Sequence, residues 1–217
     1  MGVRVARILL FAPICSTPLL AQRIPSEQAV VTEMNGARMR PAAFARYLTA
    51  LLPYFDGKVL RKPGEVGLLT EEGATAVREA IVFLERADPL SALEHSPVLA
   101  AAARAHALDQ GPRGALGHTG SDGSTMSDRI SRYGRWTGSI AENIDYGSRI
   151  ARDVVISLIV DDGVPSRGHR NNIFNPDSRH VGVACGVHRQ YGTMCVIDYA
   201  TGVQGQRGGQ LRKRGRR

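Results

Sequence analysis

Apolar positions recur at helical spacing through the first half of the chain. From Ser26 to Leu52 this spacing predicts helix, and Pro41 begins a second helix after a break near Arg40. A turn-rich stretch follows. Thr70-Glu71-Glu72 is then a helix-start signal, and the helical spacing continues to Glu85. This part of the chain is therefore expected to be mainly helical.

A further helix is expected in the middle of the chain. Ser96 is its cap and Pro97 lies in its first turn. Its interior, from Val98 to Leu108, is dominated by alanine, so we expect it to pack closely against a neighbouring element. The segment from Ser124 to Tyr133 then indicates a short helix that Gly134 stops.

Strand-like patterns gather towards the C-terminus. Ala151 to Val160 reads as one more helix, although its β-branched content leaves a strand open. The runs from Val181 to Val187 and from Thr193 to Ile197 predict two strands joined by a turn centred near Gln190. Helices early and strands late favour an α+β architecture, in which helices cover one sheet.

The N-terminus has the pattern of an export signal. Two arginines precede an apolar stretch from Ile8 to Leu20, which prolines interrupt, and the stretch ends at the small residue Ala21. Residues 1–21 are therefore expected to be a signal peptide cleaved near Ala21, too short for a spanning helix; a buried N-terminal helix is the alternative. Ile14 before Cys15 is the wrong size for lipoprotein cleavage, so we expect no lipid anchor. The mature protein is expected to be secreted or periplasmic, without a transmembrane span.

The charge is uneven along the chain. The formal net charge is +8, from 28 basic and 20 acidic residues, but eight of the bases lie in the signal and after Gln206. The segment between them is neutral, so the domain has no basic face for a specific nucleic-acid site. The tail, residues 204–217, is rich in Gly and Arg and is expected to be disordered. It would contact anionic polymers if it has a partner; a solvated end is the favoured interpretation.

Two cysteines remain once the signal is removed. Cys185 and Cys195 lie on the two predicted strands, opposite each other when the turn is centred near Gln190. An exported protein is expected to join them by a disulfide. The hairpin loop is short, so the gain in stability is expected to be about 2–3 kcal/mol at most. Without export, they would be two buried thiols.

Three polar side chains are candidates for chemistry, namely His118, Glu142 and His169. Neutral imidazole and carboxylate are suitable zinc ligands, and such a set leaves a position open for water. Asp161 or Asp162 could supply a fourth oxygen. These residues lie far apart in the sequence, so folding must bring them together. The alternative is a structural polar cluster, in which Glu142 holds a protonated histidine.

Neighbouring residues refine this picture. Arg170 is expected to orient Glu142 or an anionic ligand rather than bind metal. His106, inside the alanine-rich helix, is expected to be a packed or surface histidine rather than a ligand. Nucleophilic catalysis has little support, because the chain has no Gly-x-Ser-x-Gly elbow around Ser121.

Four segments follow one another as in a known family: Gly117-His118-Thr119-Gly120, Ala141-Glu142-Asn143-Ile144, Gly168-His169-Arg170-Asn171-Asn172-Ile173 and Val181-Gly182-Val183-Ala184. The chain resembles the CAP superfamily, the SCP-like extracellular domains named for cysteine-rich secretory proteins, antigen 5 and pathogenesis-related 1, and most of all its bacterial branch. The resemblance implies a three-layer α-β-α sandwich. It also implies a cleft, lined by two histidines and acidic residues, that binds a divalent cation in some members.

The resemblance places the core of the domain at residues 88–203. Residues 22–87 form an N-terminal helical segment that is either part of the domain or an extension. Met34-Asn35-Gly36-Ala37-Arg38 looks like the signature of the family's first helix, but a long insertion follows it. Alternatively, the helix from Val77 to Arg86 is the first one.

These observations favour a secreted binding module whose cleft holds a divalent cation and an apolar or envelope-derived ligand. Lipid and sterol binding is what the resemblance implies for several relatives. One alternative is a metal-dependent hydrolase, in which Glu142 is the general base for a water held by His118 and His169. Another is a non-catalytic interaction protein.

Overall fold

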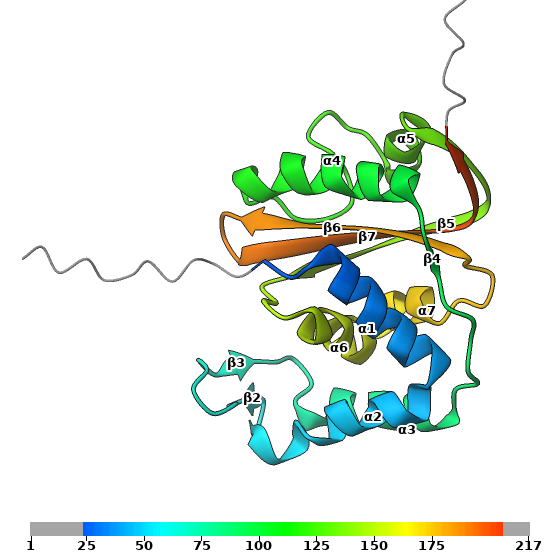
Figure 1. Ribbon diagram of the computed structural model, residues 1–217. Coiled ribbons are helices and arrows are strands. Elements are labelled where there is room, and N and C mark those ends of the chain that lie inside the picture. Colours follow the sequence, from blue (N-terminus) through cyan, green and yellow to red (C-terminus); the bar gives the residue numbers. More distant parts are fainter. Residues whose placement is uncertain (1–23, 206–217) are drawn as a thin grey trace, which may run out of the picture.

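A computed structural model describes residues 24–205 and has three main layers, with a sheet between two groups of helices (Figure 1). The expected signal peptide and the tail beyond Gly205 lie outside the described residues. The α+β class and the α-β-α arrangement predicted from the sequence are confirmed. No helix in the described part of the chain is long and apolar enough to cross a membrane.

The sheet has four strands in the order β4-β6-β7-β5. They are β4 (Glu94–His95), β6 (His180–His188), β7 (Gly192–Gly205) and β5 (Gly134–Tyr146). β4 is parallel to β6, and the other pairs are antiparallel. β5 is therefore an edge strand, and it carries Glu142.

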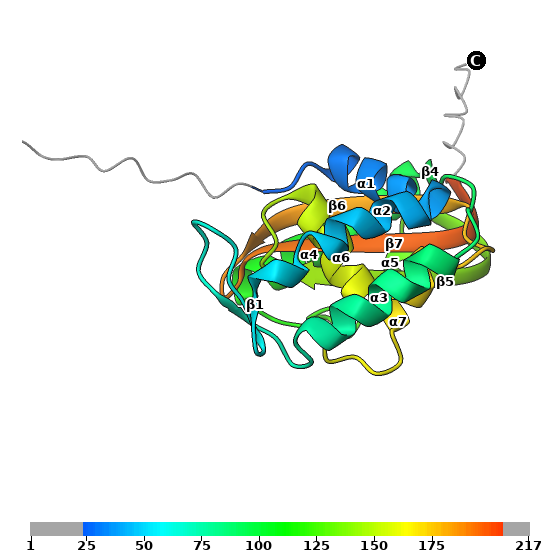
Figure 2. The same cartoon turned by 90° about the horizontal axis from the view of Figure 1, so that it is seen from below.

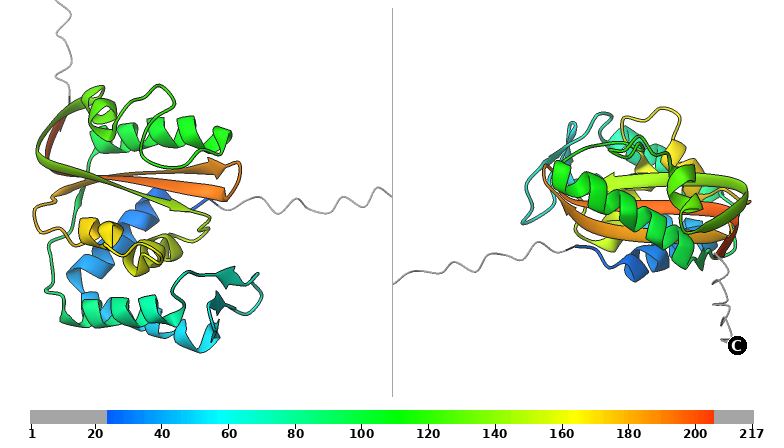
Figure 3. Two further views of the ribbon diagram at one scale, coloured as in Figure 1. Left: turned by 180° about the vertical axis from the view of Figure 1, so that it is seen from behind. Right: turned by 90° about the horizontal axis from the view of Figure 1, so that it is seen from above.

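One face of the sheet is covered by α4 (Pro97–Arg113) and α5 (Met126–Ser131) (Figures 1 and 3). The hydroxyl of Ser96 caps α4 as predicted, accepting from the backbone N of Leu99 at 3.3 Å. The alanines of α4 let the helix approach the sheet so closely that Gly182 of β6 lies directly beneath it. The predicted close packing of this helix is confirmed.

The other face carries α1 (Glu27–Met39), α6 (Ala151–Val160) and α7 (Gly168–Ile173). Farther from the sheet lie α2 (Pro41–Thr49) and α3 (Ala74–Arg86) (Figures 1 and 2). Ala151–Val160 is a helix and not a strand, with most of its aliphatic side chains in the main core. Its β-branched residues are accommodated because burial outweighs their weak helix propensity.

Two polar residues of α1 fasten it to distant parts of the chain. Asn35 pairs with Leu93, donating to its carbonyl at 3.0 Å and accepting from its backbone N at 2.8 Å. Arg38 is fully buried and donates to the carbonyl oxygens of Ile173 and Asn175. The Asn-x-x-Arg pattern of this helix thus holds α1 against the segment that leads into β4 and against the end of α7.

The turn-rich stretch after α2 contains secondary structure that the sequence did not reveal. A 3-10 turn, Leu52–Tyr54, leads into a small antiparallel sheet of three very short strands, β1 (Phe55–Asp56), β2 (Val59–Leu60) and β3 (Leu68–Leu69). Each strand has only two residues, too few to produce a periodic pattern. We call residues 53–70 the insertion; it lies at one end of the molecule (Figure 1).

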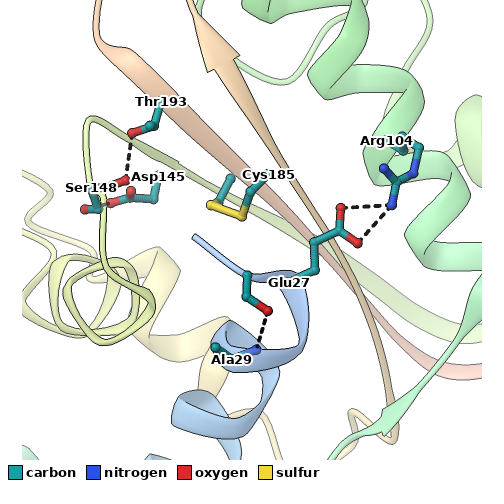
Figure 4. The surroundings of a disulfide bond; sticks show 9 residues. Glu27, Ala29, Arg104, Asp145, Ser148, Cys185 and Thr193 are labelled. Carbon is teal, nitrogen blue, oxygen red and sulfur yellow. Dashed lines mark hydrogen bonds and ion pairs between the residues drawn. A yellow bond between two sulfur atoms is a disulfide. The ribbon is translucent and has the colours of Figure 1, made fainter. Parts of the chain in front are cut away.

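The predicted disulfide is confirmed. Cys185 and Cys195 are paired across β6 and β7 and joined with an S–S distance of 2.03 Å. Figure 4 shows the bond between the start of α1, with Glu27, and the segment that holds Asp145 and Ser148. The hydroxyl of Thr193 donates to the carbonyl of Ser148 at 2.7 Å, which ties the hairpin to the connection between β5 and α6.

Candidate functional site

His118 and Glu142 form the first half of the candidate site. Nδ1 of His118 lies 2.9 Å from Oε1 of Glu142. Glu142 is buried on β5, whereas the side chain of His118 is 54% exposed on the loop between α4 and α5. The folded chain therefore uses a buried carboxylate to orient an accessible imidazole.

Arg129 of α5 holds this pair in place. It donates to Oε2 of Glu142 at 2.6 Å, and to the carbonyl oxygens of His118 at 3.0 Å and Ser124 at 3.1 Å. Both Arg129 and Glu142 are buried, so their charges are compensated by each other. Sequence reasoning did not find Arg129, because no motif surrounds it.

Arg170 does not have the role expected from the sequence. Its guanidinium donates to the carbonyl oxygens of Ile159 and Val160 at the end of α6, and to Glu79 of α3 at 2.8 Å. The expectation that it orients Glu142 was wrong. It instead covers backbone carbonyls at the C-terminus of α6, where a cation is favoured by the helix dipole.

His169 and Asp161 form the second half of the site. Nδ1 of His169 lies 2.6 Å from Oδ1 of Asp161, and the backbone N of His169 donates to Oδ2 at 2.8 Å. Asp161 ends α6 in the left-handed conformation, with φ of 54°. This conformation is uncommon outside glycine but tolerated by aspartate. Because of this conformation, the buried carboxylate of Asp161 points towards the first residues of α7.

Asp162, the other aspartate proposed from the sequence, lies in a different place. Its carboxylate accepts from the backbone N of Glu71 at 2.6 Å and of Glu72 at 2.9 Å, just before α3. The structure therefore brings Asp161, but not Asp162, to His169. Adjacent residues take separate roles because the chain reverses direction between them.

The two histidine–carboxylate pairs meet the sheet at neighbouring residues of its edge strand. Glu142 holds His118, and the side chain of Asn143 donates to the carbonyl of His169 at 2.9 Å. Successive side chains of a strand point to opposite faces, so His118 reaches β5 from the side of α4 and α5, and His169 from the side of α7. Asn172 completes the arrangement by donating to Oδ1 of Asn143 at 2.8 Å.

The geometry is that of two pairs, and not of one set of four converging ligands. Within residues 24–205 there is no group of three or more His, Cys, Asp or Glu side chains placed to hold a metal ion. In both pairs Nδ1 of the histidine is engaged by a carboxylate. In this part of the chain neither Nε2 has a hydrogen-bond partner, and the side chain of His169 is 28% exposed.

The electrostatics around Glu142 keep it ionised. Burial alone would raise the pKa of Glu142, but the hydrogen bond to His118 and the positive charge of Arg129 outweigh burial and lower it. Asp198 lies opposite Glu142 on β7 and is fully buried. Burial and the nearby charge of Glu142 raise the pKa of Asp198 well above its usual range. Of this pair, Glu142 therefore carries the charge and Asp198 the proton.

His106 is a packed histidine, as expected. It is fully buried in α4, and its Nε2 lies 2.9 Å from the carbonyl of Gly117. Burial lowers the pKa of His106, which favours its neutral form. Its role is to support the loop that carries His118.

Comparison with known proteins identifies the class. The family model described as CAP, cysteine-rich secretory protein family, matches residues 31–199, and the chain belongs to this family. The match includes most of α1, with Asn35 and Arg38, and every later element up to Tyr199. The protein is thus a CAP/SCP domain of the extracellular type.

Two solved structures are similar to it. One is an outer surface protein from Borrelia burgdorferi, with 22% identity, a TM-score of 0.44, and coverage of 51% of this chain and 78% of that one. The other is an extracellular protein containing an SCP domain from Bacillus anthracis str. Ames, with 19% identity, a TM-score of 0.41, and coverage of 51% of this chain and 34% of that one. No curated protein matches the chain at a significant level.

Proposed function

We propose that the protein is an exported binding module that holds a divalent cation, zinc in the first place, through Nε2 of His118 and of His169. The two histidines approach β5 from its two faces, and because β5 is the edge strand of the sheet, the ion would lie beyond that edge, between them. One observation carries the proposal: a buried carboxylate engages Nδ1 of each histidine, at 2.9 Å for Glu142 and 2.6 Å for Asp161. Histidines that bind metal usually donate their other ring N–H to such a group, which fixes the tautomer and raises the basicity of the ligand.

In this proposal Glu142 and Asp161 orient the histidines and do not themselves bind the ion. The oxygens of Glu142 are already engaged by His118 and Arg129, and those of Asp161 by the ring and backbone of His169. Asp162 has no part, because its oxygens are used before α3. Two imidazoles leave positions of a tetrahedral ion open. Those positions suit an oxygen of an envelope-derived ligand, beside which an apolar part of the same ligand would lie.

A binding module is favoured over a metal-dependent hydrolase by the state of Glu142. A general base must be free to accept a proton from water and needs a pKa near the working pH. Both oxygens of Glu142 are hydrogen-bonded, and its pKa is lowered. These properties make Glu142 a poor base and a good orienting group.

The cation is tested by titrating zinc into the chelated full chain and measuring heat. The wild type is expected to bind at one saturable site, and His118→Ala and His169→Ala are each expected to lose tight binding. Glu142→Gln and Asp161→Asn are expected to weaken affinity by about 10–100-fold, because the groups that orient metal-binding histidines contribute that much. The matched control is His95→Ala, which removes an exposed histidine on β4 and leaves affinity unchanged.

The outcome that contradicts the proposal is unchanged affinity in His118→Ala or in His169→Ala. Circular dichroism and the melting temperature show whether each variant folds. If an alanine variant does not fold, His118→Gln or His169→Gln keeps most of the side-chain volume. Affinity that survives in those variants would equally overturn the assignment.

A further inference from the structure

Three aliphatic side chains at the tip of the insertion face solvent. Val66 is 95% exposed, Leu68 is 61% exposed and Leu69 is 74% exposed. A single exposed leucine needs no explanation, but aliphatic residues gathered on one protruding segment mark a contact surface. None of these three side chains belongs to the hydrophobic clusters of the described residues, so the core of the domain does not depend on them.

This tip belongs to one end of the molecule, which we call the insertion end. Lys62 of the insertion forms an ion pair with Asp153 of α6 at 3.3 Å. A groove of about 620 Å³ adjoins this point and is lined in part by Ile24 and Ile150. Figures 1 and 3 show the insertion, the start of α1, the connection from β5 to α6 and the β6–β7 turn at this same end.

The exposed apolar surface continues across the insertion end. Ile24, Ile150 and Tyr191 are each about half exposed. Tyr191 lies in the β6–β7 turn, which is fixed to the β5–α6 connection by the hydrogen bond from the backbone N of Gly147 to the carbonyl of Thr193. The apolar side chains are thus carried by several segments that contact one another.

The charge of the insertion end is positive. Its three acids are all in ion pairs, Asp56 with Arg61, and Glu65 and Asp153 with the same Lys62, so these five residues carry a net charge of −1. Three further cations have no ion pair within residues 24–205, namely Lys58 in the insertion, Arg149 beside Ile150, and Arg189 in the β6–β7 turn. With these three cations the insertion end carries a net positive charge on the same end of the molecule as its exposed aliphatic groups.

We propose that the insertion end docks on an anionic lipid bilayer, with Val66, Leu68 and Leu69 entering the interface and Lys58, Arg149 and Arg189 contacting headgroups. Aliphatic side chains beside basic residues are the combination that binds such surfaces, because apolar burial and attraction to anionic lipid act together. A bilayer receives projecting side chains without a shaped pocket, which suits a narrow tip.

The docking surface is independent of the proposed cation site. His118 and His169 contact β5 and its neighbours, and neither lines the groove at the insertion end. Loss of cation binding in His118→Ala should therefore leave vesicle binding intact. Failure of one proposal does not imply failure of the other.

The test is sedimentation of the full chain with vesicles of phosphatidylcholine and phosphatidylglycerol, compared with phosphatidylcholine alone. Leu68→Ser with Leu69→Ser is expected to weaken binding to the anionic vesicles about tenfold or more, because apolar burial is lost. The matched control is Met39→Ser with Tyr133→Ser, which removes two exposed apolar side chains away from the insertion end and should have no effect. Met39 is the last residue of α1, and Tyr133 precedes Gly134, which pairs with Gly205 at the end of β7 opposite the β6–β7 turn. Measurements at high salt screen the attraction of the basic tail and retain the apolar contribution.

A second measurement separates direct insertion from binding by the tail. An environment-sensitive dye on Val66→Cys is expected to shift to the blue on anionic vesicles, and the same dye on Met39→Cys, at the far end of α1, is not. Equal binding of the leucine and control variants, or no shift at position 66, would overturn the proposal. If the leucine variant instead converts a dimer to a monomer in light scattering, the surface serves a second copy of the chain, and the membrane assignment is wrong.

Discussion

The guanidinium of Arg167 and the carboxylate of Glu72 form a two-pronged ion pair, with N–O distances of 2.6 and 2.7 Å. The pair joins the loop before His169 to the residues just before α3. The hydrogen bond from Arg167 lowers the pKa of Glu72 to about 2. Arg167 also donates to the carbonyl of Asp161 at 2.7 Å and has φ of 49°, in the left-handed region. The ion pair with Glu72 thus fixes the loop around Arg167, and this loop keeps His169 within hydrogen-bond distance of Asp161.

Replacement of Arg167 by alanine is expected to loosen this loop while the fold persists. The hydrogen bond from the backbone N of His169 to Asp161 would open more often, so exchange of the His169 amide with solvent is expected to be about tenfold faster. Hydrogen exchange followed by NMR measures it directly. Arg104→Ala is the control, since it removes another arginine–glutamate pair, between α4 and α1, in which one nitrogen of Arg104 lies 2.8 and 2.9 Å from the two carboxylate oxygens of Glu27. An equal effect of both variants would contradict the prediction.

The sequence predicted the parts of the site that lie in distinctive local segments. His118, Glu142 and His169 each have glycine or asparagine neighbours in a recognisable order, and the first two are indeed brought together. The choice between Asp161 and Asp162 could not be made from the sequence. It depends on one left-handed residue at the end of α6, after which the next side chain faces α3.

The partners of the buried arginines could not be predicted from the sequence either. Arg129 and Arg170 have the same side chain and both are buried, yet only Arg129 binds Glu142. Their partners lie on other elements, and no local pattern records which element packs beside them. The very short strands of the insertion were missed for a related reason. Each strand forms because it pairs with its neighbour, and the strand propensity of its two residues contributes little.

Gly182 is expected to be indispensable for the contact between α4 and the sheet. A Cβ at this position would lie 2.0 Å from the backbone N of Ala100 and 2.2 Å from the carbonyl carbon of Leu99. Because these are backbone atoms, Gly182→Ala must displace the helix, at a cost of about 3 kcal/mol in the free energy of unfolding. Gly186→Ala on the same strand is the control, because a Cβ there meets no atom within 4 Å. Urea denaturation of both variants checks the prediction, and equal stabilities would refute it.

The disulfide is expected to make a modest contribution to stability. Cys185 and Cys195 are ten residues apart, so their bond restricts only a short loop of the unfolded chain. Cys185→Ala with Cys195→Ala is expected to lower the free energy of unfolding by about 2–3 kcal/mol. Reduction of the wild type should give a similar loss in the same denaturation experiment. A much smaller loss on reduction would show that the bond does not constrain the unfolded state as expected.

Asp145 is expected to make the fold less stable as the pH rises from about 4 to about 6. Burial raises the pKa of Asp145 to about 6, although Ser148 donates a hydrogen bond to its carboxyl. The folded protein then holds the proton more tightly than the unfolded chain does, so ionisation of this group favours unfolding. The difference from the ordinary value of 3.8 corresponds to about 2–3 kcal/mol, present below pH 4 and lost above pH 6. Asp145→Asn, which cannot ionise, should flatten the stability profile in this window, whereas Asp177→Asn, at an exposed position, should not. A profile for Asp145→Asn that stays parallel to the wild type from pH 4 to pH 6 would show that this carboxyl is not the group responsible.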